Sequence, residues 1–346
     1  MNESPTLEYN LAEKLGEGAY AIVYKAYLKS DTKKLYPLAV KQTKPDNKEK
    51  WTGIQIDAIR EIYALRRANH PNVMKLYDVF IENGFTNLVY EYLDIGLDKI
   101  ISGSPLSEPQ AKTYFKMLIE GVNYLHNTLR ILHLDIAPKN LLISYNPDTK
   151  EPTLKIADFG LSYTYCEGRC AMAAYQNVPE LNPLTSPPEL LEPTAITLPY
   201  RAPELLYGAT QYGPPTDMWS CGCVFAEMLM GSPLFPGRTE AEQKQLIAKC
   251  LGMPNDTVWP GFSSLSAVES GAGNTGRTKQ LQQRTLQPGR SMERKGIVGL
   301  GPSSSKTVIM KLLNYNPLER PTASGILRSS YIKEGCCPLN ELPYLT

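Results

Sequence analysis

Residues suited to metal or disulfide frameworks are scarce in this sequence. Its 346 residues include three histidines, and its seven cysteines are an odd number whose spacing suggests no disulfide pattern. A zinc cluster of cysteine and histidine is therefore not indicated. We expect the thiols to be reduced, as they are in the cytosol or the nucleus.

An excess of charge and a long apolar run are also missing. The 36 basic and 35 acidic residues leave a formal net charge of +1, which gives no reason to expect direct nucleic-acid binding or an anionic membrane partner. The first ten residues do not form a basic-then-apolar signal. The most apolar helical stretch, residues 221–230, contains Glu227 and is too short to span a bilayer. We therefore expect no membrane partner.

The apolar patterning divides the chain into a β-rich part and a larger helical part, with a hinge at residues 91–96. The predicted strands of an antiparallel sheet lie at residues 15–17, 22–26, 38–41 and 88–92. The predicted helices lie at residues 56–68, 109–125, 217–229, 240–251 and 306–313. Residues 163–198 and 263–305 lack a period and are expected to form long loops. The predicted fold class is α+β, with 42% apolar residues sufficient for one large domain or two lobes.

A glycine-rich loop, residues 16–21 (GEGAYA), separates the first two predicted strands and is followed by Val23. Glycines let the backbone approach phosphate groups closely, so that its N–H groups can cradle them. A single G-x-G is a weak signal, because a tight hairpin has the same composition. Ala21 replaces the third glycine of the usual phosphate-loop pattern.

A lysine and a glutamate form the next candidate pair. Lys41 ends a predicted apolar strand, and Glu61 lies on the predicted helix that follows. Such a lysine can hold the α- and β-phosphates of a nucleotide if a carboxylate fixes it. Taken alone, the pair would equally be a surface lysine and an exposed glutamate.

Two later motifs carry a proton acceptor and metal ligands. In residues 133–140 (HLDIAPKN), Asp135 would accept the proton of a substrate hydroxyl and Asn140 would bind a metal ion. In residues 158–160 (DFG), after a predicted strand at 153–157, Asp158 would bind Mg²⁺ between the β- and γ-phosphates, and Gly160 would permit a sharp turn.

The order of these motifs, closed by residues 202–204 (APE), is typical of protein kinases. Phosphoryl transfer depends on positioning and on charge neutralisation, and this set supplies both. The sequence therefore predicts transfer of the γ-phosphoryl group of ATP to a protein hydroxyl.

Further segments resemble the cyclin-dependent kinases, over nearly the whole chain. The helix at residues 56–61 (IDAIRE) resembles their signature helix, and similar segments lie at residues 69–73, 200–206, 217–223 and 233–237. The CDK-activating, transcription-associated subgroup fits best. Its likeness is found at residues 18–24, 53–54, 206–209 and 330–333.

This resemblance implies a bilobal fold with ATP and Mg²⁺ between a lobe of residues 1–93 and a lobe of residues 94–335. Residues 158–204 would be a long activation segment, residues 263–305 an insert and residues 336–346 a tail. Tyr90 would be the gatekeeper, and the backbone of Glu91 and Leu93 would hold adenine. The remaining nucleotide contacts would be Leu15, Gly16, Glu17, Gly18, Ala19, Val23, Ala39, Lys41 and Leu142.

The resemblance also implies partners and a location. A cyclin of the cyclin H type would dock on the helix from Ile56 to Glu61 and push Glu61 toward Lys41. Serine or threonine followed by proline would be the acceptor, in substrates such as other kinases or the RNA polymerase II tail. A general transcription factor complex would be a further partner, and the protein would reside in the nucleus, with the cytoplasm as an alternative. Glu204 and Arg320 would form a buried ion pair.

Three departures from the family concern the activation segment. Leu134 replaces an arginine that grips a phosphothreonine, Tyr163 replaces a second arginine, and Glu192 occupies the phosphothreonine position. Of the three usual arginines only Arg60 remains, and Glu192 would pair with it. We hypothesise that activity does not depend on phosphorylation of this segment. Thr194 is the competing phosphorylation site.

A fourth departure concerns the catalytic loop. Ala137 stands where Ser/Thr kinases place a lysine, and Lys139 appears two positions later, which resembles tyrosine kinases. We expect Lys139 to perform the same electrostatic task. Two alternatives therefore stay open: a tyrosine or dual-specificity kinase, and a pseudokinase scaffold. Leu134, Ala137 and Ala21 argue mildly for the scaffold, and the retained polar residues argue against it.

Overall fold

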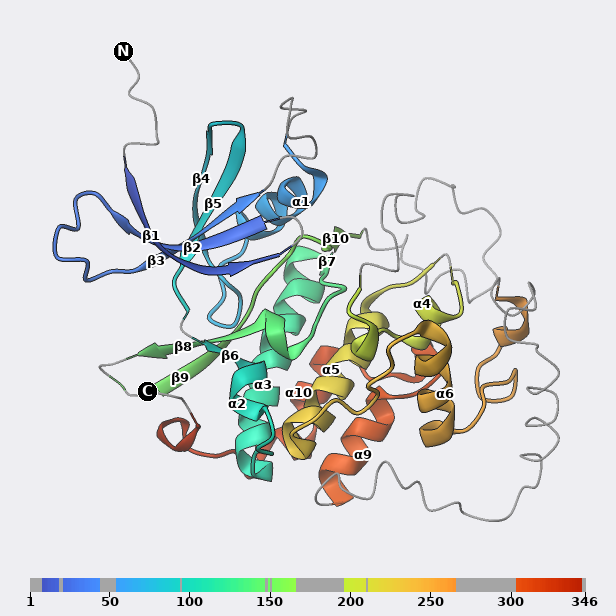
Figure 1. Ribbon diagram of the computed structural model, residues 1–346. Coiled ribbons are helices and arrows are strands. Elements are labelled where there is room, and N and C mark those ends of the chain that lie inside the picture. Colours follow the sequence, from blue (N-terminus) through green and yellow to red (C-terminus); the bar gives the residue numbers. More distant parts are fainter. Residues whose placement is uncertain are drawn as a thin grey trace.

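The computed structural model places a twisted sheet and one helix before a larger, mostly helical lobe (Figure 1). It describes residues 8–18, 21–43, 54–93, 95–146, 149, 151–165, 196–209, 211–265 and 303–343. Within these ranges no helix is long and apolar enough to cross a membrane. The predicted α+β class with two lobes is confirmed.

The sheet of the first lobe is antiparallel, with the strand order β1-β2-β3-β5-β4. Its strands are β1 (Tyr9–Glu17), β2 (Ala21–Leu28), β3 (Leu38–Thr43), β4 (Leu76–Glu82) and β5 (Phe85–Glu91). Strand β4 was not predicted. Asn83 and Gly84, which join it to β5, both have positive φ angles of 49° and 81°. Two such residues form the tight turn that matches the twist of paired strands, so the hairpin follows from local chemistry.

The helix of the first lobe, α1 (Ile56–Leu65), lies beside the sheet (Figure 1). It ends before the predicted residue 68. Its buried positions include Ala58, Glu61 and Leu65, whereas Ile59 is 46% exposed. The apolar spacing correctly predicts the helix, yet part of its apolar surface faces away from the core.

The second lobe is built around two long helices, α3 (Glu108–Tyr124) and α5 (Pro214–Met230). Its other helices are α2 (Leu97–Ile101), α4 (Pro203–Leu206), α6 (Glu240–Leu251), α9 (Ser303–Leu312), α10 (Ala323–Arg328) and α11 (Ser330–Lys333). Its short strands are β6 (Ile95–Gly96), β7 (Ile131–Leu132), β8 (Leu141–Asn146), β9 (Glu151–Ile156) and β10 (Tyr163–Thr164). The prolines that open α5 occupy its first turn, where a missing N–H costs no hydrogen bond.

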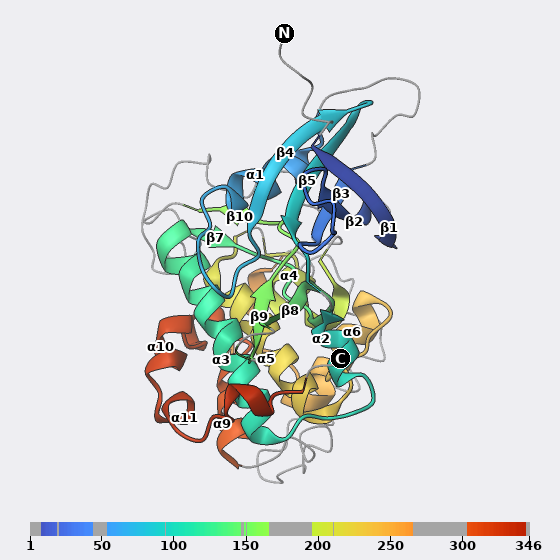
Figure 2. The ribbon, with the colours of Figure 1, turned by 90° about the vertical axis from the view of Figure 1, so that its left-hand side faces the viewer.

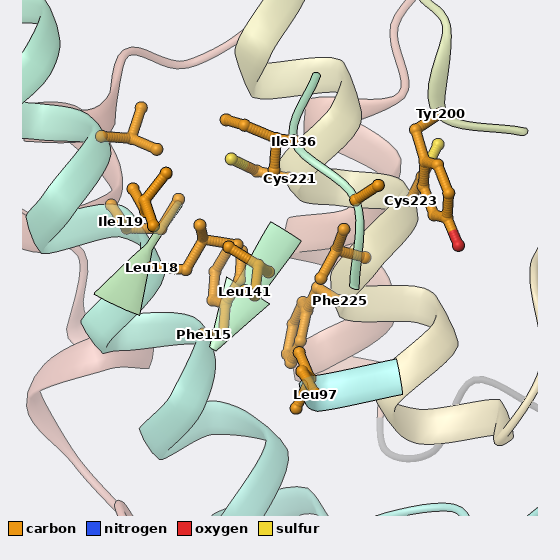
Figure 3. Close-up of a cluster of buried hydrophobic side chains, with 14 of the residues drawn as sticks. Leu97, Phe115, Leu118, Ile119, Ile136, Leu141, Tyr200, Cys221, Cys223 and Phe225 are labelled. Carbon is orange, nitrogen blue, oxygen red and sulfur yellow. The ribbon is translucent and has the colours of Figure 1, made fainter. Parts of the chain in front are cut away.

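Aromatic stacking joins the two long helices. The rings of Phe115 on α3 and Phe225 on α5 lie 4.2 Å apart between centroids (Figure 3). Ile136, from the loop that follows β7, enters the same buried cluster. Cys221 and Cys223 are buried free thiols there. The core therefore reaches directly under the residues that follow Asp135.

Strand β9, which leads to Asp158, is held by the segment that follows α1. The side-chain amide of Asn72 donates to the carbonyl of Leu154 at 2.9 Å, and the amide of Ile156 donates to the carbonyl of Asn72 at 3.0 Å. A β-carbon on Gly121 of α3 would lie 2.8 Å from the Asn72 carbonyl oxygen, so only glycine allows this approach. Figure 2 shows α3 running alongside β9.

The two segments expected to be long loops are mostly outside the described residues. Where they are described, both are partly regular, which corrects the prediction at their ends. Tyr163 and Thr164 form β10 against β7, and Leu198–Tyr200 forms a 3₁₀ turn. A second 3₁₀ turn covers Phe262–Ser264, and α9 begins at Ser303.

Candidate active site

Three predicted site residues, far apart in the chain, meet at one ammonium group. The Lys41 Nζ atom lies 2.7 Å from Glu61 Oε2 and 2.9 Å from Asp158 Oδ1. Burial alone would lower the pKa of Lys41, but the attraction of Glu61 and Asp158 outweighs it and raises the pKa above its ordinary value. Burial would likewise raise the pKa of Asp158, but Lys41 outweighs it and lowers that pKa. Lys41 and Asp158 are therefore charged at neutral pH.

The strained backbone conformation beside this cluster belongs to Asp158 itself. Its φ angle is +61°, in the left-handed region that non-glycine residues rarely adopt. The φ of Gly160 is not in that region, and a β-carbon there would meet Asp158 and Asp57 only at 3.6 Å. Gly160 does lie in a turn, because the amide of Ser162 donates to the Phe159 carbonyl at 3.0 Å, but the left-handed residue of the motif is Asp158, two positions earlier. Phe159 is fully buried, with its ring edge-on to His133 at 4.8 Å.

Asp135, 7% exposed, is held by hydrogen bonds on both of its oxygens. Its Oδ2 accepts from Asn140 Nδ2 at 2.7 Å, and its Oδ1 accepts from the amide and the hydroxyl of Thr197 at 3.0 and 2.5 Å. Asn140 Nδ2 also donates to the Asp135 carbonyl at 2.8 Å. This network fixes the carboxylate in one orientation.

Lys139 lies on the solvent side of this carboxylate. Its Nζ is 3.5 Å from Asp135 Oδ2, its side chain is 56% exposed, and its charge also lowers the pKa of Asp158. Ala137, where Ser/Thr kinases place a lysine, is fully buried in the main core cluster and carries no charge. Lys139 therefore supplies positive charge close to both Asp135 and Asp158.

The catalytic loop, residues 133–140, is anchored by a carboxylate that was not predicted to belong to the site. Asp217 at the start of α5 accepts from the amides of His133 and Leu134 at 2.9 and 2.8 Å, and it lies 2.8 Å from His126 Nε2. Burial would raise its pKa, but the bonds from His126 outweigh this and lower it. The segment that begins at Asp217 was predicted only as a helix and as a family likeness, and Thr197 was not assigned to the site.

The glycine loop has space around it. A β-carbon at Gly16 would meet no atom within 4 Å, and one at Gly18 would meet only the carbonyl oxygen of Ala21, at 3.9 Å. Neither glycine has a left-handed φ. Packing and backbone strain therefore do not require glycine at these two positions, whereas a ligand that approaches the loop backbone would require it.

The predicted adenine-binding residues share one apolar surface. Ala39 and Tyr90 are buried in the main core cluster, and Val23, Leu93 and Leu142 pack against it half-buried. Burial, assisted by the nearby Glu61, raises the pKa of the Tyr90 phenol. Leu15 is 40% exposed on β1.

The side chain of Glu91 forms polar contacts of its own. Its carboxylate accepts from the Lys75 amide at 2.9 Å and pairs with Lys155 Nζ, also at 2.9 Å. These contacts anchor the end of β5, where the backbone of Glu91 and Leu93 is predicted to bind adenine.

The donors present fit a magnesium ion. The amide nitrogen of Asn140 donates to Asp135, so its Oδ1 points away from Asp135 and could bind the metal. Asp158 has a second carboxylate oxygen besides the one that contacts Lys41. In the described part of the chain no three acidic, histidine or cysteine residues gather to enclose a metal. Two protein ligands with water and phosphate completing the shell is the coordination that Mg²⁺ ordinarily adopts beside nucleotides.

Several predicted residues lie outside the described ranges. They are Ala19 of the glycine loop and, in the activation segment, Glu192 and Thr194. The pairing of Arg60 with Glu192 therefore stays a prediction. Within the described residues, Arg60 pairs with Asp57 at 3.3 Å.

The bilobal fold, together with this arrangement of lysine, glutamate and two aspartates, defines a protein kinase. A family model described as "Protein kinase domain" matches residues 9–332. The chain is 32% identical over 335 residues to Cyclin-dependent kinase 7 of Dictyostelium discoideum, which covers 95% of this chain and 80% of that protein.

A solved structure gives the same answer. A chain in the structure of the CAK complex from Chaetomium thermophilum bound to ATP-gamma-S is similar with a TM-score of 0.74 and 31% identity, over 99% of this chain and 96% of that chain. The protein thus belongs to the protein kinase family and, within it, to the cyclin-dependent kinases of the CDK-activating kind.

Proposed function

We propose that the protein is a cyclin-dependent serine/threonine kinase that transfers the γ-phosphoryl group of ATP to hydroxyls followed by proline. The observation that carries the proposal is the double contact of Lys41 with Glu61 and Asp158 in one structure. A protein kinase is active only when its lysine–glutamate pair is formed and its second aspartate is placed to bind Mg²⁺, and the contacts of Lys41 meet the first condition and bring Asp158 beside it. The ATP-gamma-S in the similar Chaetomium complex supports ATP as the donor.

The geometry assigns a task to each group of residues. Lys41, fixed by Glu61, would hold the α- and β-phosphates, and the loop amides near Gly16 and Gly18 would cover them. Magnesium, held by Asn140 and Asp158, would neutralise the charge that develops on the phosphates during transfer. These positions leave the terminal phosphate facing the catalytic loop.

Asp135 would orient the acceptor hydroxyl and take its proton as the oxygen attacks the γ-phosphorus. The hydrogen bonds from Asn140 and Thr197 hold the carboxylate for this step. Lys139 would stabilise negative charge on the transferred group, since its Nζ lies only 3.5 Å from Asp135 Oδ2. Retention of all these contacts weighs against a pseudokinase scaffold.

A direct assay separates the readings of specificity. The full chain, purified with its bound partners, is incubated with radiolabelled ATP and with peptides of the RNA polymerase II tail, and the product is hydrolysed for phosphoamino-acid analysis. We expect phosphoserine, and loss of labelling when the proline after the serine is replaced by alanine. Phosphotyrosine would instead support the tyrosine-kinase alternative, which the placement of Lys139 favours. No labelled product of any kind would support a scaffold.

A cyclin is the proposed partner of α1. Apolar side chains on the outer face of this helix are exposed: Ile56 by 47%, Ile59 by 46% and Tyr63 by 54%. Glu61 lies on the opposite, buried face and holds Lys41. A partner that covers the outer face would therefore fix the helix, and with it the ion pair.

Ile59→Glu is expected to abolish cyclin capture and to lower kinase activity at least tenfold, about the effect of placing an unpaired charge in a buried interface. Co-purification of the cyclin from native cells, read by mass spectrometry, checks this. Lys249→Glu, on the exposed face of α6 in the second lobe, serves as a charge control and should retain the cyclin. Undiminished capture by Ile59→Glu would place the cyclin elsewhere.

Nuclear residence and a general transcription factor complex are proposed from the family alone, and the same co-purification would report on that complex.

A further inference from the structure

A second apolar cluster, separate from the main core, lies beside the catalytic aspartate. Leu132, Leu134, Ile196 and Leu205 form its buried centre, with exposures of 1%, 1%, 4% and 5%. Four partly buried side chains pack around them: Leu161, Tyr163, Tyr165 and Tyr212. All eight side chains are apolar or aromatic, and the buried cation next to them, Arg201, donates to the Ile196 carbonyl at 2.6 Å and pairs with Glu240.

The cluster holds both sides of the hydrogen-bond network on Asp135. Leu134 directly precedes Asp135, and Ile196 directly precedes Thr197, whose amide and hydroxyl bind the carboxylate. The burial of Leu134 and Ile196 in one cluster therefore helps to fix the distance between the aspartate and the threonine that orients it. Leu205 adds the first turn of α4 to the same contact.

Leu134 adopts a backbone conformation that it would not choose freely. Its φ is +67°, which crowds the β-carbon of any residue other than glycine. The bond from its amide to Asp217 and the burial of its side chain together hold it there. Because φ at residue 134 sets the direction of the next residue, loss of the side-chain packing would let Asp135 turn.

The beginning of the activation segment is tied to the same place. Strand β10 pairs with β7, with Tyr163 opposite Leu132, and the Tyr165 hydroxyl donates to the His126 carbonyl at 2.7 Å. His126 in turn contacts Asp217. The cluster thus joins the catalytic loop, the start and the end of the activation segment, and α5.

A phosphate would be poorly accommodated at this cluster. Phosphate groups are held in proteins by cations and charge-assisted hydrogen bonds, and two of the three residues that supply them in related kinases are here Leu134 and Tyr163. The remaining one, Arg60, pairs with Asp57. Burial raises the pKa of Tyr212, and the positive charge of the nearby Arg60 opposes this rise.

We propose that this apolar cluster positions Asp135, with Leu134 as its positioning residue, and that it maintains activity without a phosphate on the activation segment. The inference rests on the proposed kinase activity for its kinetic consequence. Its structural part, the ordering of the loop by Leu134, stands apart from catalysis and can be measured separately.

The first test compares Leu134→Ala with Leu134→Met in the full chain purified with its partners. Leu134→Ala is expected to lower kcat by about tenfold to a hundredfold, the effect of misplacing a catalytic group by about 1 Å, with KM for ATP changed less than about twofold. Leu134→Met, which conserves volume, should restore most of kcat. Ile326→Ala on α10 removes a similar buried side chain far from the site, and should lower the melting temperature without this loss of kcat.

Hydrogen exchange supplies the readout that does not require activity. The amides of His133, Leu134 and Thr197, which bond to Asp217 and Asp135, should exchange faster in Leu134→Ala and at the wild-type rate in Leu134→Met. Unchanged exchange would overturn the positioning role even if the kinase is active. Changed exchange in a chain that phosphorylates nothing would support the positioning role while the proposed function failed.

Phosphatase treatment tests the second half of the proposal. Wild-type enzyme should keep most of its activity after treatment, whereas Leu134→Arg, which places an unpaired charge in the cluster, should lose most of its activity in either state. A wild type inactivated by phosphatase, or a Leu134→Arg variant that gains activity and loses the gain on dephosphorylation, would overturn the proposal.

Discussion

Replacement of Asp135 by asparagine is expected to lower kcat by about 10²–10⁴-fold, the usual contribution of a positioned general base. The substitution preserves size and leaves an oxygen to accept the bond from Asn140, but it removes the group that takes the substrate proton. KM for ATP should stay near the wild-type value, because Asp135 does not belong to the Lys41 cluster that is proposed to hold the nucleotide. Transfer of radiolabelled phosphate under saturating ATP measures the effect.

Two comparisons make this result specific. Lys139→Ala should reduce kcat by a smaller factor, with little effect on KM for ATP, because it removes stabilisation of developing charge and leaves the base intact. Asp256 is an exposed aspartate that accepts the amide of Ser263, and Asp256→Asn should leave kcat unchanged. An Asp135→Asn enzyme that retains half of the wild-type kcat would exclude Asp135 as the base.

The residues of the nucleotide site were predictable because phosphate chemistry restricts them strongly. Lys41 and Asp158 are 117 positions apart, yet each was identified from its own motif, and the order of motifs implied that they meet. Their contact at 2.9 Å required the complete fold, which no single motif describes. The sequence identified the site residues and the order of their motifs, and the structure added the distances between them and their charge interactions.

Other features were missed although a local signal existed. Asn83-Gly84 is a strong hairpin signal, and a closer reading of it would have predicted β4 as well as β5. The left-handed φ of the motif belongs to Asp158 and not to Gly160, so the backbone strain lies on the functional residue itself. Local rules fail most readily at such positions, where the surrounding fold holds a conformation that the residue itself disfavours.

A third group could not be read from local sequence at all. The loss of an arginine at position 134 was evident, but its apolar replacement depends on Ile196 and Leu205, more than sixty positions away. The same is true of Asp217, which binds the amides of residues 133 and 134 from the start of α5. Such contacts join distant segments, and no period or spacing along the chain encodes them.

The buried ion pair of Arg320 and Glu204 carries the largest expected effect on stability. Their side chains are 0% and 2% exposed, with Arg320 Nη2 2.7 Å from Glu204 Oε2 and Arg320 Nη1 2.8 Å from Oε1. Arg320 also donates to the carbonyls of Asn314 and Pro215, and its guanidinium lies over the ring of Trp219. Removing one charge leaves the other buried without its partner.

Arg320→Met is therefore expected to lower the free energy of unfolding by about 3–5 kcal/mol, whereas the double variant Glu204→Gln/Arg320→Met should recover part of the loss, because it no longer buries a lone charge. Urea denaturation followed by fluorescence measures the free energy of unfolding of the wild type, the single variant and the double variant. Lys116→Met breaks the exposed pair with Glu120, at 3.9 Å on α3, and should cost no more than about 0.5 kcal/mol. If Arg320→Met resembles that surface control, the pair does not join α4 to the rest of the helical lobe, and the burial of Glu204 must be compensated by its bond from Thr216 alone.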